Sequence, residues 1–218
     1  MDAALSGPAA VATIVGVSLV TIGWRVRRAP SAAWGGRPDG LLAVALVAVA
    51  AALLLGMGRV PSYRHGPFRL YAGDVHGDEN SQQLTDPYTF THVTHGVLLY
   101  GALALTAGRA PLMLRALVAV AAESTWEVLE NTDAVIRRYR AATIAQGYDG
   151  DSVVNSVGDI AAAALGFALA ATLPAGATIG LAVALEAILL VWIRDDLALN
   201  VLMLLWPLDW VRAWQSSG

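Results

Sequence analysis

The chain has 218 residues, of which 56% are hydrophobic and 14% charged, and its mean hydropathy is +0.57. A formal net charge of -3 provides no basic surface that could neutralise nucleic-acid phosphates, which argues against nucleic-acid binding. The lack of cysteine excludes disulfides, thiolate metal ligands and a cysteine nucleophile, so any metal would need histidine and carboxylate ligands. Together with apolar runs of bilayer-spanning length, this composition predicts a multi-pass membrane protein.

The first apolar segment covers residues 9–24 and is followed by Arg25, Arg27 and Arg28. A signal peptide would carry its basic residues before the apolar segment, so we expect an uncleaved helix. Residues 1–40 are therefore predicted to form an additional N-terminal helix and a basic linker, and residues 41–218 a membrane domain.

Five further apolar segments are predicted to be transmembrane helices. Only helices and closed barrels satisfy every backbone group in lipid, and the two-residue alternation of barrel strands is absent from the sequence. The segments cover approximately residues 41–58, 90–107, 111–130, 153–173 and 177–193. The predicted fold is an all-α polytopic transmembrane bundle with five or six spans.

The C-terminal tail, residues 197–215, holds an apolar run that is too short to span a membrane. Trp206, Trp210 and Trp214 recur every four residues, which is typical of a helix lying at the membrane interface. The alternative is that these tryptophans pack on the bundle.

Ionisable residues within the spans gather at one end of the predicted bundle. A charge in hydrocarbon costs several kcal/mol, so such residues usually face the bundle interior and mark a functional site. If the arginines after the first helix lie in the cytoplasm, this end faces the envelope. Six arginines in the loops at the same end oppose that orientation: Arg59, Arg64, Arg69, Arg137, Arg138 and Arg140.

His92 and His95 lie three residues apart, so both rings point to one side of a helix. They could ligate one metal or act as a base and its orienting partner. The alternative is an interfacial pair that caps the start of the helix.

Glu123, Glu127 and Glu130 recur at intervals of four and three residues and form one stripe of carboxylates. Unpaired like charges this close repel, so either some carboxyl groups are protonated or a cation binds them. A solvated helix end is the alternative for Glu130, whereas Glu123 and Glu127 follow an apolar run and favour a function.

Asp151, Asn155 and Asp159 recur every four residues and form a further polar stripe. Helix capping by Asp151 or Ser152 explains Asp151 without a function. Asp159 lies about two turns deeper and needs a partner, which Asn155, a histidine or a loop arginine could supply. Paired with arginine, Asp159 would only hold the helices together.

The three stripes predict one site. Imidazole and carboxylate ligands on bundle helices build metal sites that activate water, and without a metal neighbouring carboxylates can divide acid and base roles. The predicted catalytic residues are His92, His95, Glu123, Glu127 and Asp159. A divalent metal, the possible cofactor, would draw its ligands from the same five residues together with Asp151 and Asn155.

Three functions fit these features. An enzyme acting on a lipid or lipid-linked substrate at the envelope is favoured by the clustering, with membrane lipid as the expected partner and no protein partner indicated. Glu186, alone in the middle of the last span, favours a small ion or solute carrier. A non-catalytic assembly factor would fit a cluster that is purely structural. Arg194, Asp195 and Asp196 at the end of that span either complete the site or form an ion pair at its rim.

Four strings carry a resemblance: Y-T-F-T-H-V-T-H-G at 88–96, W-E-V-L-E-N at 126–131, Y-D-G-D-S-V-V-N-S-V-G-D at 148–159 and I-R-D-D-L-A-L-N-V-L-M-L-L-W-P at 193–207. With them the chain closely resembles, over roughly 41–215, an uncharacterised bacterial inner-membrane family carried under a UPF, or domain-of-unknown-function, label. The resemblance implies a multi-pass plasma-membrane protein and no particular activity. A C-x-C-G pattern of that family is replaced here by Tyr63, Arg64, His65 and Gly66, so a thiol role there does not carry over.

Overall fold

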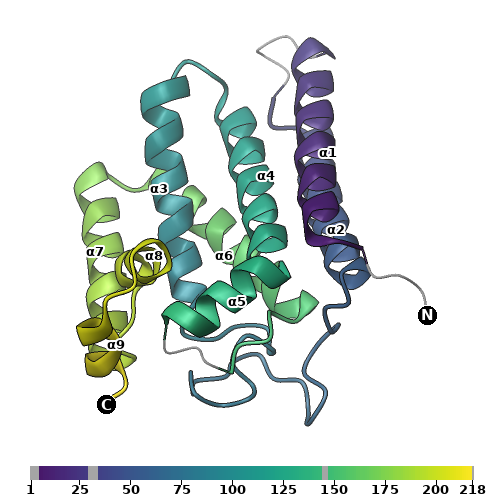
Figure 1. The fold of residues 1–218 in the computed structure, drawn as a ribbon. Coiled ribbons are helices and arrows are strands. Elements are labelled where there is room, and N and C mark those ends of the chain that lie inside the picture. Colours follow the sequence, from purple (N-terminus) through teal and green to yellow (C-terminus); the bar gives the residue numbers. More distant parts are fainter. Residues whose placement is uncertain (1–4, 29–33, 144–146, 218) are drawn as a thin grey trace.

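Helices dominate the computed structural model of the chain, which describes residues 5–28, 34–143 and 147–217 (Figure 1). No strand occurs within these ranges, so the predicted all-α fold is confirmed. The long helices are α1 (Gly7–Arg28), α2 (Arg37–Gly56), α3 (Thr89–Ala107), α4 (Leu112–Glu130), α6 (Val153–Thr172) and α7 (Ala175–Trp192). The short ones are α5 (Asp133–Ala142), α8 (Leu197–Leu205) and α9 (Asp209–Gln215).

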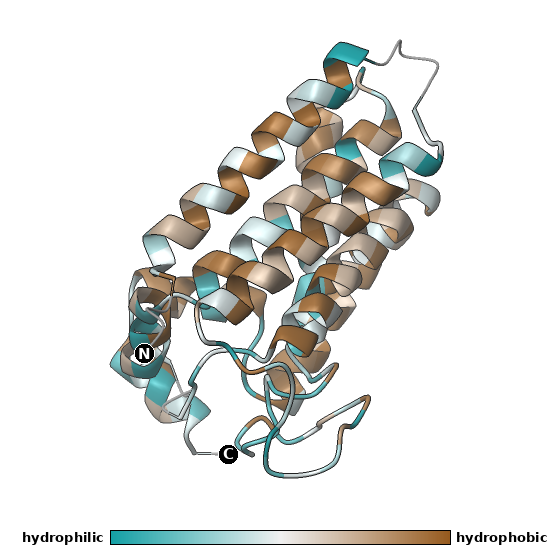
Figure 2. Cartoon of the chain, turned by 90° about the vertical axis from the view of Figure 1, so that its right-hand side faces the viewer, coloured by the Kyte–Doolittle hydropathy of each residue, from teal (hydrophilic) through white to brown (hydrophobic). Residues whose placement is uncertain are grey.

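Four helices, α1, α2, α6 and α7, are long and apolar enough to cross a membrane, which indicates a membrane protein. Hydrophobic residues follow the long helices in Figure 2, while hydrophilic residues gather at their ends and in the loops. Helices α3 and α4 have 19 residues each, pack among the apolar helices and carry most of the ionisable residues of the predicted site. These ionisable residues make α3 and α4 less hydrophobic. Composition alone therefore identifies fewer membrane-spanning helices than the five or six that were predicted.

Helices α3 and α6 cross with their backbones in close contact. A Cβ built on Gly96 would lie 1.9 Å from the carbonyl oxygen of Ala163, and one built on Gly166 would lie 2.0 Å from the carbonyl oxygen of Val93. Only glycine, which has no side chain, permits this approach. The crossing fixes the histidines of α3 against the carboxylate of α6.

An ion pair joins α1 to α2 at the end remote from these histidines. The Nε and NH2 groups of Arg25 donate to the two carboxylate oxygens of Asp39 over 2.5 and 3.1 Å, and the backbone N–H of Gly35 donates to the same carboxylate over 2.8 Å. Helix α2 begins at Arg37, earlier than the predicted start at 41, because Pro38 occupies a first-turn position that favours helix initiation.

The opposite end carries the long loop 57–88, α5, α8 and α9 (Figure 1). The loop is ordered by internal contacts, such as those of the Gln83 side chain with the Arg69 N–H and the Pro67 carbonyl oxygen. In the tail, Trp206 and Trp210 are 72% and 69% exposed, whereas Trp214 is 40% exposed and its ring lies 5.7 Å from the guanidinium of Arg194. Trp206 lies between α8 and α9 rather than on one helix with the other two.

Candidate functional site

Two histidines of α3 meet two glutamates of α4 in the bundle interior. Oε1 of Glu123 lies 2.6 Å from Nδ1 of His92 and 3.0 Å from Nδ1 of His95. Oε1 of Glu127 lies 3.4 Å from the same His92 nitrogen. Because residues three and four apart share a helix face, each helix presents both of its side chains to the other.

Asp159 joins this group from α6. Its Oδ2 lies 3.8 Å from Nε2 of His92, on the side of the imidazole away from the glutamates. His92 therefore stands between carboxylates of two helices. The structure brings together all five residues predicted to be catalytic, and the roles assigned to them remain predictions.

Glu127 is fully buried, yet neither of its carboxylate oxygens has a hydrogen-bond partner among the described residues. Asp159 is 4% exposed, and its Oδ1 is likewise without one. A buried carboxylate without hydrogen bonds costs several kcal/mol, so it needs a proton or a cation.

The arginines of the neighbouring loops and of α5 bind elsewhere. Arg138 donates from Nε to the Leu204 carbonyl oxygen over 2.7 Å, and Arg140 pairs with Asp149. Arg59 donates to the Asp149 carbonyl oxygen over 2.6 Å and lies 3.6 Å from Asp133. Pairing with arginine, the structural alternative for Asp159, therefore does not account for the buried carboxylates.

Two groups of side chains offer ligands close enough for one ion. They are His92, His95 and Glu123, and His92, Glu127 and Glu130, with the donor atoms of each group within 4.8 Å of one another. Imidazole nitrogen and carboxylate oxygen are ligands of zinc and of other borderline divalent cations. The unpartnered oxygens of Glu127 and this donor set both fit a divalent metal.

Asp151 and Asn155 belong to an adjoining network of hydrogen bonds. Oδ2 of Asp151 accepts from Nδ2 of Asn131 over 2.7 Å and from the Tyr148 hydroxyl over 3.0 Å. Nδ2 of Asn155 donates to Asp86 over 3.4 Å. Burial raises the pKa of Asp151 to about 6, so this group changes its charge near neutral pH. No hydrogen bond or ion pair joins either residue to the two histidines in the part of the chain that the structure describes.

Asp86 is a site residue that the sequence analysis missed. Its carboxylate accepts from the backbone N–H groups of Ser81, Tyr88 and Thr89 over 2.8, 2.8 and 3.2 Å. Burial raises its pKa above the ordinary range of an aspartate. An aspartate followed by proline just before an apolar segment is a helix-start signal that could have identified it.

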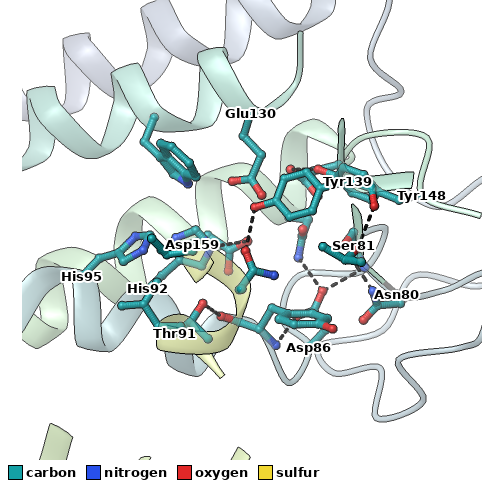
Figure 3. A pocket seen from close by; sticks show the side chains of 18 residues that line it. Asn80, Ser81, Asp86, Thr91, His92, His95, Glu130, Tyr139, Tyr148 and Asp159 are labelled. Atoms are coloured by element: carbon teal, nitrogen blue, oxygen red, sulfur yellow. Dashed lines mark hydrogen bonds and ion pairs between the residues drawn. The ribbon is translucent and has the colours of Figure 1, made fainter. Parts of the chain in front are cut away.

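A cavity of about 70 Å³ adjoins the cluster on the side of the long loop (Figure 3). His92, His95 and Asp159 line one side of it, and Tyr139 and Tyr148 line the other. Glu123 and Glu127 are not among the residues that line the cavity, whereas His92, which contacts both, is.

Glu186 of α7 and the charged residues that follow this helix attach α8 and α9 to the bundle. Glu186 accepts from the backbone N–H of Ala198 over 3.2 Å, at the start of α8. Asp196 caps α8 by accepting from the Leu199 N–H over 2.7 Å, and Arg194 donates to the Trp214 carbonyl oxygen over 2.9 Å. Asp195 accepts from the Tyr88 hydroxyl over 3.2 Å, and burial raises its pKa to about 6. These contacts give Glu186, Arg194 and Asp196 structural roles. Among the contacts just described, that of Asp195 alone involves a residue that lines the cavity, Tyr88.

Comparison with known proteins places the chain in a family. The family described as "Protein of unknown function (DUF2585)" matches residues 54–217, which include every site residue named above. A UPF0314 protein of Paracoccus denitrificans is 51% identical over 79% of this chain and 90% of its own length, and one of Novosphingobium aromaticivorans is 48% identical over 76% and 86%. No solved structure matches the chain. The chain therefore belongs to the DUF2585 family and is a relative of the UPF0314 proteins, which confirms the resemblance predicted from its motifs.

Proposed function

We propose that the protein is an enzyme of the bacterial plasma membrane that acts at the envelope face on a lipid or lipid-linked substrate. The observation that carries the proposal is Glu127, a fully buried carboxylate that has no hydrogen-bond partner among the described residues and lies 3.4 Å from Nδ1 of His92. A divalent metal bound here would supply a Lewis acid that generates hydroxide from water near neutral pH.

The donor atoms already lie at separations that suit one ion. Ligands about 2.1 Å from a tetrahedral metal are roughly 3.4 Å from one another. The measured distances from Nδ1 of His92 are 2.6 Å to Glu123 and 3.4 Å to Glu127, and Nδ1 of His95 is 3.0 Å from Glu123. Small side-chain adjustments would therefore suffice for binding.

Asp159 is the side chain best placed to accept a proton. It lines the cavity, and its Oδ1 has no hydrogen-bond partner within the described chain. A general base must reach the proton it removes, directly or through one water molecule, and a water in this cavity meets that condition. His92 lies between Asp159 and the glutamates, so it connects the proposed base with the proposed metal ligands.

Two observations favour the enzyme over the carrier. A carrier needs a polar route through the bundle, but α3 and α6 are in backbone contact at Gly96 and Gly166. Glu186, the residue that favoured a carrier, accepts a hydrogen bond at the start of α8. The polar cluster is thus supported as a site at one membrane face.

Metal content tests the proposal directly. The protein, purified in a mild detergent, should contain about one divalent metal per chain by elemental mass spectrometry, and a chelator should remove it. His95→Ala should reduce the content at least tenfold, whereas His76→Ala, a change in the exposed loop, should not. Lipid products from metal-loaded protein in nanodiscs of bacterial lipid should likewise be lost in His95→Ala. Absence of metal after purification and after incubation with zinc, manganese and iron would contradict the proposal.

Reporter fusions test the orientation. The basic residues that follow the first helix favour a cytoplasmic location for that end, because the first helix usually dominates topology. Fusions at Gly108 and Gly176 should therefore report cytoplasm, and those at Gly73 and Gly147 should report the envelope side. Reversed signals at all four positions would move the site to the inner leaflet.

A further inference from the structure

The cavity beside the cluster has a lining rich in carboxyl groups. Four carboxylates border it, from Asp86, Glu130, Asp151 and Asp159, and neither lysine nor arginine occurs among the described residues around it. Asp86 and Asp151 accept hydrogen bonds from other residues of the protein, but Oδ1 of the 96%-buried Asp159 has no hydrogen-bond partner in the part of the chain that the structure describes. The lining therefore suits a cation that can donate a hydrogen bond.

The cavity has room for more than a bare ion. Its volume is about 70 Å³, and a water molecule occupies roughly 10 to 15 Å³ by this measure. The space is therefore that of about five water molecules, which is comparable to a small organic ammonium group with its adjoining carbons.

The wall opposite Asp159 is aromatic. Tyr139 and Tyr148 line it, and their hydroxyls already donate to Asn200 over 3.1 Å and to Asp151 over 3.0 Å. Rings whose polar atoms are engaged offer a metal no ligand, but they stabilise an organic cation through their π systems.

Helix α8 gives this cavity an apolar edge. Leu197 and Val201 line it, and the same helix exposes Val201, Leu202 and Leu205 by 43%, 40% and 77%. An acyl chain could lie along this surface while a headgroup occupies the cavity, because the exposed side chains of α8 are apolar, as lipid tails are.

We propose that the cavity binds the primary ammonium group of a lipid headgroup. This inference rests on the proposed function and specifies its substrate class as an amine-bearing lipid. A primary ammonium has N–H donors for Asp159, whereas a quaternary ammonium has none and would leave that buried oxygen unpaired. The neighbouring His92 then lies close to the bound headgroup.

Calorimetric titration of the full chain with ethanolamine hydrochloride tests the inference. The protein is kept in maltoside detergent with a chelator, so the outcome does not depend on bound metal and a failure here leaves the metal test of the proposed function intact. We expect saturable binding of ethanolamine, none of ethylene glycol, which has a similar size and no charge, and at least tenfold weaker binding of choline. Equal binding of ethylene glycol, or binding of magnesium and calcium alone, would overturn the assignment.

Substitutions at the rim and floor of the cavity locate the binding. Val201→Lys places a competing cation at a half-exposed position and should abolish ethanolamine binding, while Val201→Met, of similar length and no charge, should preserve it. Asp159→Asn should weaken binding at least tenfold, and Asp209→Asn, on the exposed start of α9, should leave it unchanged. If Val201→Lys binds ethanolamine like the wild type, the amine lies elsewhere and the assignment fails.

A short-chain phosphatidylethanolamine distinguishes a lipid headgroup from a free amine. If the substrate is a lipid, it should bind at least tenfold more tightly than ethanolamine, and short-chain phosphatidylglycerol should not compete with it. Equal affinities of the lipid and of free ethanolamine would remove the lipid from the inference.

Discussion

Glu127→Gln should lose its bound metal while keeping the fold of the wild-type protein. The substitution preserves shape and removes the charge, so the metal content measured by elemental mass spectrometry should fall at least tenfold. When a chelator has removed the metal, the thermal unfolding midpoint of the variant in detergent should equal or exceed that of the wild type. The metal-free wild type is destabilised by a buried carboxylate that has no hydrogen-bond partner among the described residues.

Glu123→Gln provides the matched comparison on the same helix. Glu123 contacts both imidazoles, at 2.6 and 3.0 Å, so its substitution should lower both the metal content and the unfolding midpoint. If Glu127 instead formed an essential ion pair with His92, removing one partner would cost about 3 to 5 kcal/mol. A lowered midpoint in Glu127→Gln, with the metal content unchanged, would therefore leave this glutamate a structural role only.

The long helices were predictable because their signals are local. Runs of apolar residues gave 41–58 for a helix that spans Arg37–Gly56, and 153–173 for one that spans Val153–Thr172. The three- and four-residue spacings also predicted which side chains of one helix would share a face. Neither signal determines where the helices cross. The distances between residues of different stripes could therefore not be predicted from the sequence.

The predicted stripe of Asp151, Asn155 and Asp159 shows where the four-residue spacing alone was misleading. Asp151 lies two residues before α6 begins at Val153, whereas Asp159 lies on the helix, so helical spacing does not relate the two. His92 reaches Asp159 at 3.8 Å, whereas Asp151 contacts Asn131 and Tyr148 instead. Residues whose spacing suggests one helix face can therefore belong to two adjoining polar networks.

Several other cavity residues come from segments outside the spans, and apart from Asp86, whose helix-start position is a sequence signal, they could not be predicted. Asp86 and Tyr88 precede α3, Tyr139 lies on α5, and Tyr148 precedes α6. Their positions depend on how the loops fold over the end of the bundle, for which no periodic pattern exists in the sequence. The acidic and aromatic character of the cavity is thus a tertiary property.

Gly96→Ala should destabilise the protein strongly, by roughly 3 kcal/mol, the upper end of typical overpacking costs. The added methyl carbon would lie 1.9 Å from the Ala163 carbonyl oxygen and 2.6 Å from the Phe167 backbone nitrogen. Both are backbone atoms, which cannot rotate away as a flexible side chain would, so α3 and α6 must separate. Thermal or denaturant unfolding in detergent measures the effect.

Gly101→Ala, on the same helix, is the control because a Cβ there meets no atom within 4 Å. Since alanine favours helix over glycine by about 1 kcal/mol, this variant should unfold at or above the wild-type midpoint. Separation of α3 from α6 would also lengthen the 3.8 Å distance between His92 and Asp159, so Gly96→Ala should lose lipid-product formation, which needs the proposed base, even where it still folds and binds metal. Equal midpoints for the two variants would show that the backbone contact at Gly96 does not hold the site together, and the packing of α3 on α4 would then have to position His92 instead.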